Sequence, residues 1–199
     1  MKTSIKTLIA TSLTAIVLST AVFSTTVLAA VNPLAISAVK TFKKISVSGN
    51  VEVTLIQRTA TGVAYTDENV GTAKIMQEGD ILRITATHGS TAKIIVYVDD
   101  IYRIEASGNA VVKTEGKLTS KYLQIFLKGN AHAEINTTTE GLYTVIQDDA
   151  DLKLSGSTDN HTLVMGNTQK LTIEKFAALK TNISSVEFTA VDKEIASIN

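Results

Sequence analysis

Polar and apolar residues alternate in several segments of the chain. Between Lys43 and Ile56 apolar residues come at every second position, and the alternation resumes after Gly49-Asn50. A period of two is typical of strands with one buried face, so this segment predicts two strands joined at a tight corner. Four more strands are predicted in the next section, where we expect hairpins or other antiparallel pairs. They are Val63–Thr66, Ala73–Gln77, Ile81–Thr87 and Ala92–Val98.

Beyond residue 100 the pattern becomes periodic on a longer scale. An apolar residue precedes each of five successive corners, and these residues advance by 21, 19, 19 and 18 positions: Ala106, Leu127, Ile146, Met165 and Ile183. Two further apolar series keep a constant offset of 19: Ala133, Leu152 and Leu171, and Ile135, Leu154 and Ile173. A constant offset would place each apolar side chain above the previous one in successive coils.

This periodicity favours a parallel β-helix, with coils clearest over residues 101–191. Each coil must turn sharply, and the corners carry Gly, Asn or Asp, which tolerate left-handed backbone conformations best. The first such corner is Ser48-Gly49-Asn50. The alternative is an antiparallel sandwich with evenly spaced hairpins, but hairpins do not require columns in register at one offset.

The N-terminal segment 1–29 reads as a secretory signal peptide. Lys2 and Lys6 provide a positive start, an apolar stretch runs from about Leu8 to Val27, and Val27-Leu28-Ala29 fits the small-residue cleavage pattern. We predict cleavage after Ala29, with Ala30 as the alternative site. An uncleaved anchor is the competing interpretation, and the many Ser and Thr residues in the stretch disfavour it.

Residues 30–199 are then expected to form a single exported domain. The chain has 19 basic and 19 acidic residues, so losing two lysines leaves the domain slightly acidic and gives no indication of nucleic acid or an anionic membrane as partner. It has no cysteine, which excludes disulfides and thiolate chemistry. No membrane span is predicted after cleavage.

The order of several short motifs resembles one known family. They are the strand pair Phe42–Val53, the segment Gly79-Asp80-Ile81-Leu82-Arg83-Ile84, and corners such as Ser107-Gly108-Asn109 and Lys128-Gly129-Asn130. Together they are similar to the GIN domain proteins, also called DUF2807 or putative auto-transporter adhesin head domains, which are common exported proteins of Bacteroidota. The resemblance covers Phe42 to about Val191. It implies a right-handed parallel β-helix, export and an adhesin role, and it transfers no catalytic residue.

Two groups of polar residues are candidates for function. Asp148, Asp149 and Asp151 form an acidic corner that could bind calcium or act as an acid and base, although turn propensity also explains the first two. His132, Asp151 and Lys170 follow one another at steps of 19 and would stack outward on adjacent coils. They predict a surface binding stripe, with a solvated face of weakly paired charges as the alternative.

Other chemistry finds little support in the sequence. The three histidines lack the spacing of zinc ligands, and no Gly-x-Ser-x-Gly or phosphate-binding loop is present. Low aromatic content, without Trp, weakens the case for sugar-binding platforms. No metal ion or cofactor is predicted.

The leading hypothesis is therefore an exported, non-enzymatic binding or adhesion module for a protein or glycan in the periplasm, at the cell surface or outside the cell. A carbohydrate-active enzyme using the Asp148–Asp151 corner is the second hypothesis, and a structural or envelope-sensing protein is the third. The unpaired strand edges at the ends of a coil stack also favour oligomers unless loops cap them.

Overall fold

The structure is a computed structural model that describes residues 36–37, 39–66, 72–86, 91–166 and 170–185. The chain divides into two units, Met1–Ala30 and Val31–Asn199, and every described residue belongs to the second. The predicted signal peptide therefore lies outside the described residues. Within these ranges the chain forms strands and turns without a helix, which confirms the expected all-β class. In particular, this part of the chain contains no helix with the length and apolar content of a membrane span.

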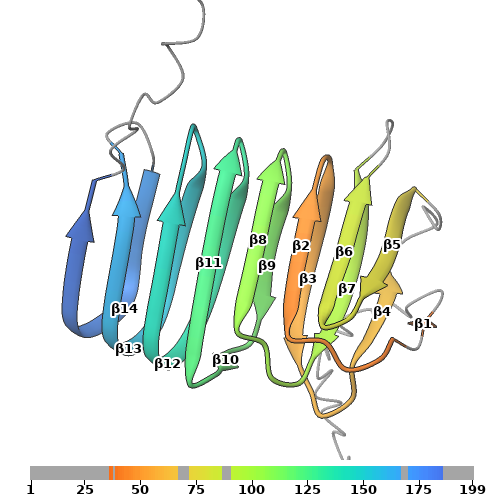
Figure 1. Cartoon of the computed structure of the whole chain (residues 1–199), viewed down its shortest axis with the longest axis horizontal. Helices are drawn as coiled ribbons and strands as arrows, with labels where there is room; N and C mark the ends of the chain where they lie inside the picture. Colours follow the sequence, from red (N-terminus) through yellow and green to blue (C-terminus); the bar gives the residue numbers. More distant parts are fainter. Residues whose placement is uncertain (1–35, 38, 67–71, 87–90, 167–169, 186–199) are drawn as a thin grey trace, which may run out of the picture. The chain divides into compact units, whose positions relative to one another are not determined.

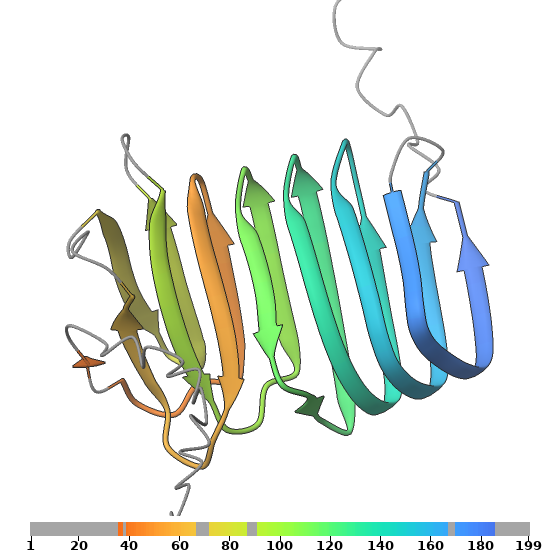
Figure 2. The same cartoon turned by 180° about the vertical axis from the view of Figure 1, so that it is seen from behind.

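Fourteen strands form one sheet that folds over, so that its two sides face each other (Figures 1 and 2). They are β1 (Ile36–Ser37), β2 (Lys44–Ser48), β3 (Val51–Gln57), β4 (Gly62–Tyr65), β5 (Ala73–Glu78), β6 (Ile81–Ala86), β7 (Ala92–Val98), β8 (Arg103–Gly108), β9 (Val111–Glu115), β10 (Leu118–Thr119), β11 (Tyr122–Gly129), β12 (His132–Ile146), β13 (Asp151–Met165) and β14 (Lys170–Ser184).

Parallel pairing runs through most of this sheet. On one side β6, β2, β8 and β11 are parallel neighbours, and on the other side β7, β3, β9 and the start of β12 are parallel neighbours. The long strand β12 joins the two sides, because its first residues pair with β9 and its last six with β11. β13 and β14 repeat the same bent path, as Figure 1 shows at the blue end of the chain.

The apolar columns predicted from the offsets lie in register. Ala133 pairs with Leu152 and Leu152 with Leu171, while Ile135 pairs with Leu154 and Leu154 with Ile173. The column before the corners also holds from Ala106 through Leu127 and Ile146 to Met165. These columns supply much of the buried core between the two sides of the sheet.

The corner residues also stack on one another. Gly49, Gly108 and Gly129 have φ values of 84°, 69° and 73°, in the region that glycine enters without steric cost. A Cβ added to Gly129 would lie 3.2 Å from the backbone nitrogen of Gly108, and one added to Gly108 would lie 3.3 Å from that of Gly49. Both the backbone conformation and the close spacing of the stacked corners therefore select glycine at positions 108 and 129.

The last strand, β14, departs from the predicted register. Ile183 pairs with Leu163 rather than following Met165, so its predicted place in the column is wrong. The pairing of β13 with β14 is irregular between Leu154 and Gly156, where β14 accommodates one extra residue near Lys175, whose φ is 53°. A bulge of this kind shifts every later residue of the strand by one position.

The expectation for the section 62–98 is correct only in part. β5 pairs with β6, and β4 pairs with β1 and β7, all antiparallel. However, β6 and β7 also pair in parallel with β2 and β3, with Ile45 opposite Leu82 and Val53 opposite Ile94. The pair β2 and β3 therefore lies between the pair β6 and β7 and the pair β8 and β9. Alternation alone cannot distinguish these arrangements, because parallel and antiparallel strands share a period of two.

Candidate functional site

The predicted stripe of His132, Asp151 and Lys170 lies in register on adjacent coils. His132 pairs with Asp151 across β12 and β13, and Asp151 pairs with Lys170 across β13 and β14. The Nδ1 atom of His132 is 3.1 Å from an oxygen of Asp151, and both side chains are about one third exposed. The stacking is therefore observed, whereas a binding role for the stripe stays a prediction.

The same outer side carries further charges that compensate one another. Lys113 lies beside Glu134 in register, and the lysine contacts Glu52 at 2.9 Å while the glutamate contacts Lys153 at 3.3 Å. Each exposed pair of this kind contributes at most about 1 kcal/mol to stability. Opposite charges on neighbouring strands leave this side, which we call the charged face, with little net field to attract a partner.

The acidic corner has a structural explanation at two of its three positions. Asp148 adopts a φ of 56° where the preceding coils carry glycine, and its carboxylate accepts a hydrogen bond from the backbone N–H of Gly129 at 3.0 Å. Asp151 contacts His132, and Asp149 is exposed at the turn. Within the described ranges, no three His, Asp or Glu side chains gather closely enough to hold a metal ion.

The opposite outer side presents a group of aromatic residues. Tyr122 and Phe126 lie on β11, and Tyr143 lies on the neighbouring part of β12. The rings of Phe126 and Tyr143 are 5.8 Å apart between centroids, and the Arg103 guanidinium lies 4.9 Å from the centroid of Phe126. Tyr122 is 58% exposed and Tyr143 is 37% exposed. We call these four side chains, together with Gln124 between Arg103 and Tyr143 in register, the aromatic face.

Two open hollows flank the rings of the aromatic face. One, of about 220 Å³, is lined by Phe126 together with Glu105, Ser107, Lys128 and Gln147. The other, of about 260 Å³, is lined by Tyr122 and Tyr143 together with Gln124, Asn160 and Thr162. Each hollow therefore combines an aromatic wall with amide, hydroxyl or charged groups.

The polar groups of this face are held by hydrogen bonds. Arg103 donates from Nε to the side-chain oxygen of Gln124 at 2.8 Å, and its Nη1 lies 3.3 Å from Glu105. These contacts fix the guanidinium beside Phe126. Gly141 lies beneath Tyr122, because a Cβ at this position would be only 2.9 Å from the tyrosine ring.

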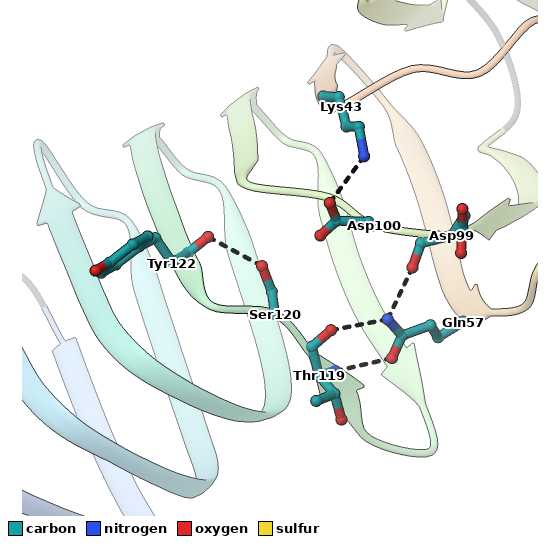
Figure 3. Close-up of polar contacts among 7 residues, drawn as sticks. All are labelled: Lys43, Gln57, Asp99, Asp100, Thr119, Ser120 and Tyr122. Carbon is teal, nitrogen blue, oxygen red and sulfur yellow. Dashed lines mark hydrogen bonds and ion pairs between the residues drawn. The ribbon is translucent and has the colours of Figure 1, made fainter.

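The segment that leads into Tyr122 is also fixed (Figure 3). Gln57 donates to the carbonyl oxygens of Asp99 and Thr119 and accepts from the N–H of Thr119, each at 2.8 Å. Ser120 donates to the carbonyl oxygen of Tyr122 at 3.0 Å, and the tyrosine ring points away from this network. Hydrogen bonds therefore hold the backbone next to Tyr122, which has the most exposed ring of the aromatic face.

The aromatic face was not predicted from the sequence, because a low number of aromatic residues does not show whether the fold brings them together. Tyr122 and Phe126 are four positions apart on one strand, so they share a face. The offset of 19 places Tyr143 beside Gln124, between those two rings. The signal was present in the same periodicity that predicted the apolar columns.

The structure defines an all-β domain of stacked, mainly parallel strands whose two outer sides differ in chemistry. Its sequence matches the model of the DUF2807 family, described as "Putative auto-transporter adhesin, head GIN domain", over residues 41–188, and the chain belongs to this family. This membership confirms the resemblance noted from the sequence motifs.

Solved structures with a similar fold include two described as putative adhesins. The protein from Parabacteroides merdae has a TM-score of 0.55 and 13% identity, and that from Parabacteroides distasonis has 0.57 and 12%, each match covering 76% of both chains. A putative lipid binding protein from Parabacteroides distasonis has a TM-score of 0.57 and 10% identity, covering 76% of this chain and 77% of its own. At these identities the likeness concerns the fold alone. Among curated proteins, none matches the chain.

Proposed function

We propose that this chain is an exported, non-enzymatic adhesion module that binds a glycan through its aromatic face. The observation that carries the proposal is the exposure of Tyr122 and Tyr143 beside the hydrogen-bonding groups of Gln124 and Asn160. The family description supports an adhesion role. A protein partner was the other expectation, and the experiment below separates the two.

The chemistry of the aromatic face suits a sugar chain. A pyranose ring has an apolar side that packs against an aromatic ring, while its hydroxyl groups need donors and acceptors at the edge of that ring. Gln124 and Asn160 each carry an amide that offers both, and Thr162 adds a hydroxyl in the same hollow. We infer that one sugar unit packs against Tyr122 or Tyr143 while a neighbouring unit reaches toward Phe126.

The architecture fits presentation of such a surface. We infer that the parallel coils wind as a right-handed β-helix, as the family resemblance implies, and that cleavage after Ala29 releases the domain into the periplasm, to the cell surface or outside the cell. A stack of hydrogen-bonded coils keeps the outward side chains at fixed spacing, so little conformational entropy is lost when a ligand binds.

The earlier candidates receive less support than the aromatic face. The stripe of His132, Asp151 and Lys170, with Asp148 and Asp149 at its end, remains a prediction, but its nearest charges pair with one another. The enzyme hypothesis needed a convergent acidic centre, whereas Asp148 holds a turn and Asp151 contacts His132.

The test is binding of the purified exported chain to a broad panel of glycans, followed by calorimetry on the best ligand. Tyr143→Ala and Tyr122→Ala should each weaken binding about tenfold, which corresponds to about 1.4 kcal/mol. Tyr122→Phe should bind nearly as well as the native chain because it keeps the ring. Glu134→Gln, on the charged face, is the matched control and should leave affinity unchanged.

Two results would overturn the proposal. The first is the absence of binding across the panel, combined with capture of a protein partner that Tyr143→Ala abolishes, which would assign the face to protein recognition. The second is a loss of glycan affinity in Glu134→Gln equal to that in Tyr143→Ala, which would place the site on the charged face.

A further inference from the structure

Strand β14 at the end of the stack exposes apolar side chains whose counterparts in β13 are buried. In the described part of the chain, β14 pairs only with β13. Ile173 and Ile183 of β14 lie opposite Leu154 and Leu163, which are 0% and 3% exposed. Yet Ile173 is 52% exposed and Ile183 is 69% exposed. Two columns that are buried in the preceding coil therefore reach the surface at the blue end of Figure 1.

An uncovered end of this kind has two physical costs. Within the described residues, large apolar side chains of β14 are open to water, and one edge of this 15-residue strand has no partner. Stacks of coils in natural proteins generally carry an atypical terminal element that covers both. A segment that covers β14 must therefore supply both apolar contacts and a partner for this edge.

We propose that residues Val186–Ile198 of the same chain cover this end of the stack. The segment follows β14 almost directly, so it needs no linker to reach the uncovered row. It contains apolar residues at intervals with polar residues between them, as a covering element with one buried side requires. These apolar residues are Val186, Phe188, Val191, Ile195 and Ile198.

Charge complementarity supports this occupant over a second copy of the chain. β14 carries Lys170, Lys175 and Lys180 with a single acidic residue, whereas the segment that follows carries Glu187, Asp192 and Glu194 with a single lysine. A pair formed by two copies of β14 would instead bring the lysine-rich strands together, and like charges on adjacent strands are destabilising.

The family comparison adds one point. The family match ends at residue 188, just after this segment begins. Most of the proposed cover therefore lies beyond the part of the chain that matches the family model.

Disulfide trapping in the full chain tests the proposal, because the native sequence contains no cysteine. Ile173→Cys is combined in turn with Phe188→Cys, Thr189→Cys, Ala190→Cys or Val191→Cys, and oxidation is followed on non-reducing gels. We expect an intramolecular disulfide that forms at least tenfold faster at the best of these four positions than at the worst. Met76→Cys, on β5 at the other end of the stack, combined with Val191→Cys is the matched control and should form no intramolecular disulfide.

The outcomes separate the occupants. A disulfide between two chains would overturn the proposal and assign the uncovered end to a second copy. Similar rates at all four positions, or thiols that remain free, would also overturn it, because a segment that does not pack on β14 has no preferred contact. Circular dichroism of each reduced variant verifies that the sheet is intact before oxidation.

Discussion

Replacing Gly156 by alanine should be one of the most damaging single-methyl changes in this protein. Gly156 lies in β13 opposite Thr137 of β12 and has a φ of 101°. A Cβ at this position would overlap the carbonyl oxygen of Thr137 and lie 2.9 Å from its carbonyl carbon. Both atoms belong to the backbone of a paired strand, so neither can rotate away. The clash must therefore be relieved by separating β12 from β13.

The magnitude follows from two costs. A left-handed backbone costs a residue other than glycine about 1–2 kcal/mol. Forcing an extra methyl group into a packed interior adds about 1–3 kcal/mol. The free energy of unfolding should therefore fall by about 2–5 kcal/mol, which lowers the melting temperature of a domain of this size by roughly 10 °C.

Gly79→Ala is the matched control for this prediction. Gly79 has a φ of 60°, and a Cβ there would meet no atom within 4 Å. Only the backbone cost remains, about 1 kcal/mol, and the melting temperature should fall by about 2–4 °C. Urea and thermal unfolding of both variants, followed by circular dichroism, provide the comparison. Equal losses in the two variants would refute the argument that stacking of the coils, rather than φ alone, requires glycine at position 156.

Two further predictions concern Asp148 and His161. Asp148→Ala should lower the free energy of unfolding by about 1–2 kcal/mol, because it removes the acceptor for the Gly129 N–H and leaves an alanine at positive φ, whereas Asp148→Gly should change it by less than about 1 kcal/mol. Urea midpoints of the two variants measure the difference, and equal losses would contradict this explanation. Burial lowers the pKa of His161, whose Nε2 lies 3.1 Å from the hydroxyl of Thr144. The unfolded chain therefore binds a proton at this residue at higher pH than the folded chain, so stability should decrease as the pH falls below about 6.5. His161→Gln should flatten that part of the profile of urea midpoint against pH, and an unchanged slope would exclude His161 as its source.

The apolar columns of the core could be predicted because they depend on one quantity, the constant offset of 19 residues between successive strands. Once the offset of 19 was recognised between Ala133, Leu152 and Leu171, parallel stacking followed from the geometry of strands. The corner residues agreed independently, since glycine or aspartate stands wherever the backbone takes a left-handed conformation in this column. Two unrelated physical requirements therefore indicated the same arrangement.

The order of the coils could not be predicted from the same evidence. β2 and β3 are flanked by β6 and β7 on one side and by β8 and β9 on the other, although they precede all four of these strands in the sequence. The alternation in each strand specifies which residues are buried but not which strand lies next to it. The register of β14 escaped prediction for a different reason. A single extra residue near Lys175 does not alter composition, yet it places Ile183 opposite Leu163, whereas the offset of 19 would have placed it opposite Val164.

Stacking in register decides whether a given number of charged or aromatic residues produces a surface that can bind a ligand. On the charged face, neighbouring strands place opposite charges beside one another, as in Glu134 with Lys153, so each added coil cancels part of the field of the previous one. On the aromatic face, the same stacking brings Phe126 and Tyr143 together, and the area of the rings adds rather than cancels. A chain with few aromatic residues can therefore still build an aromatic surface, provided that a constant offset collects them. For this reason we expect a ligand to bind the aromatic face, where the rings add contact area, and not the charged face, where the ionisable groups pair with one another.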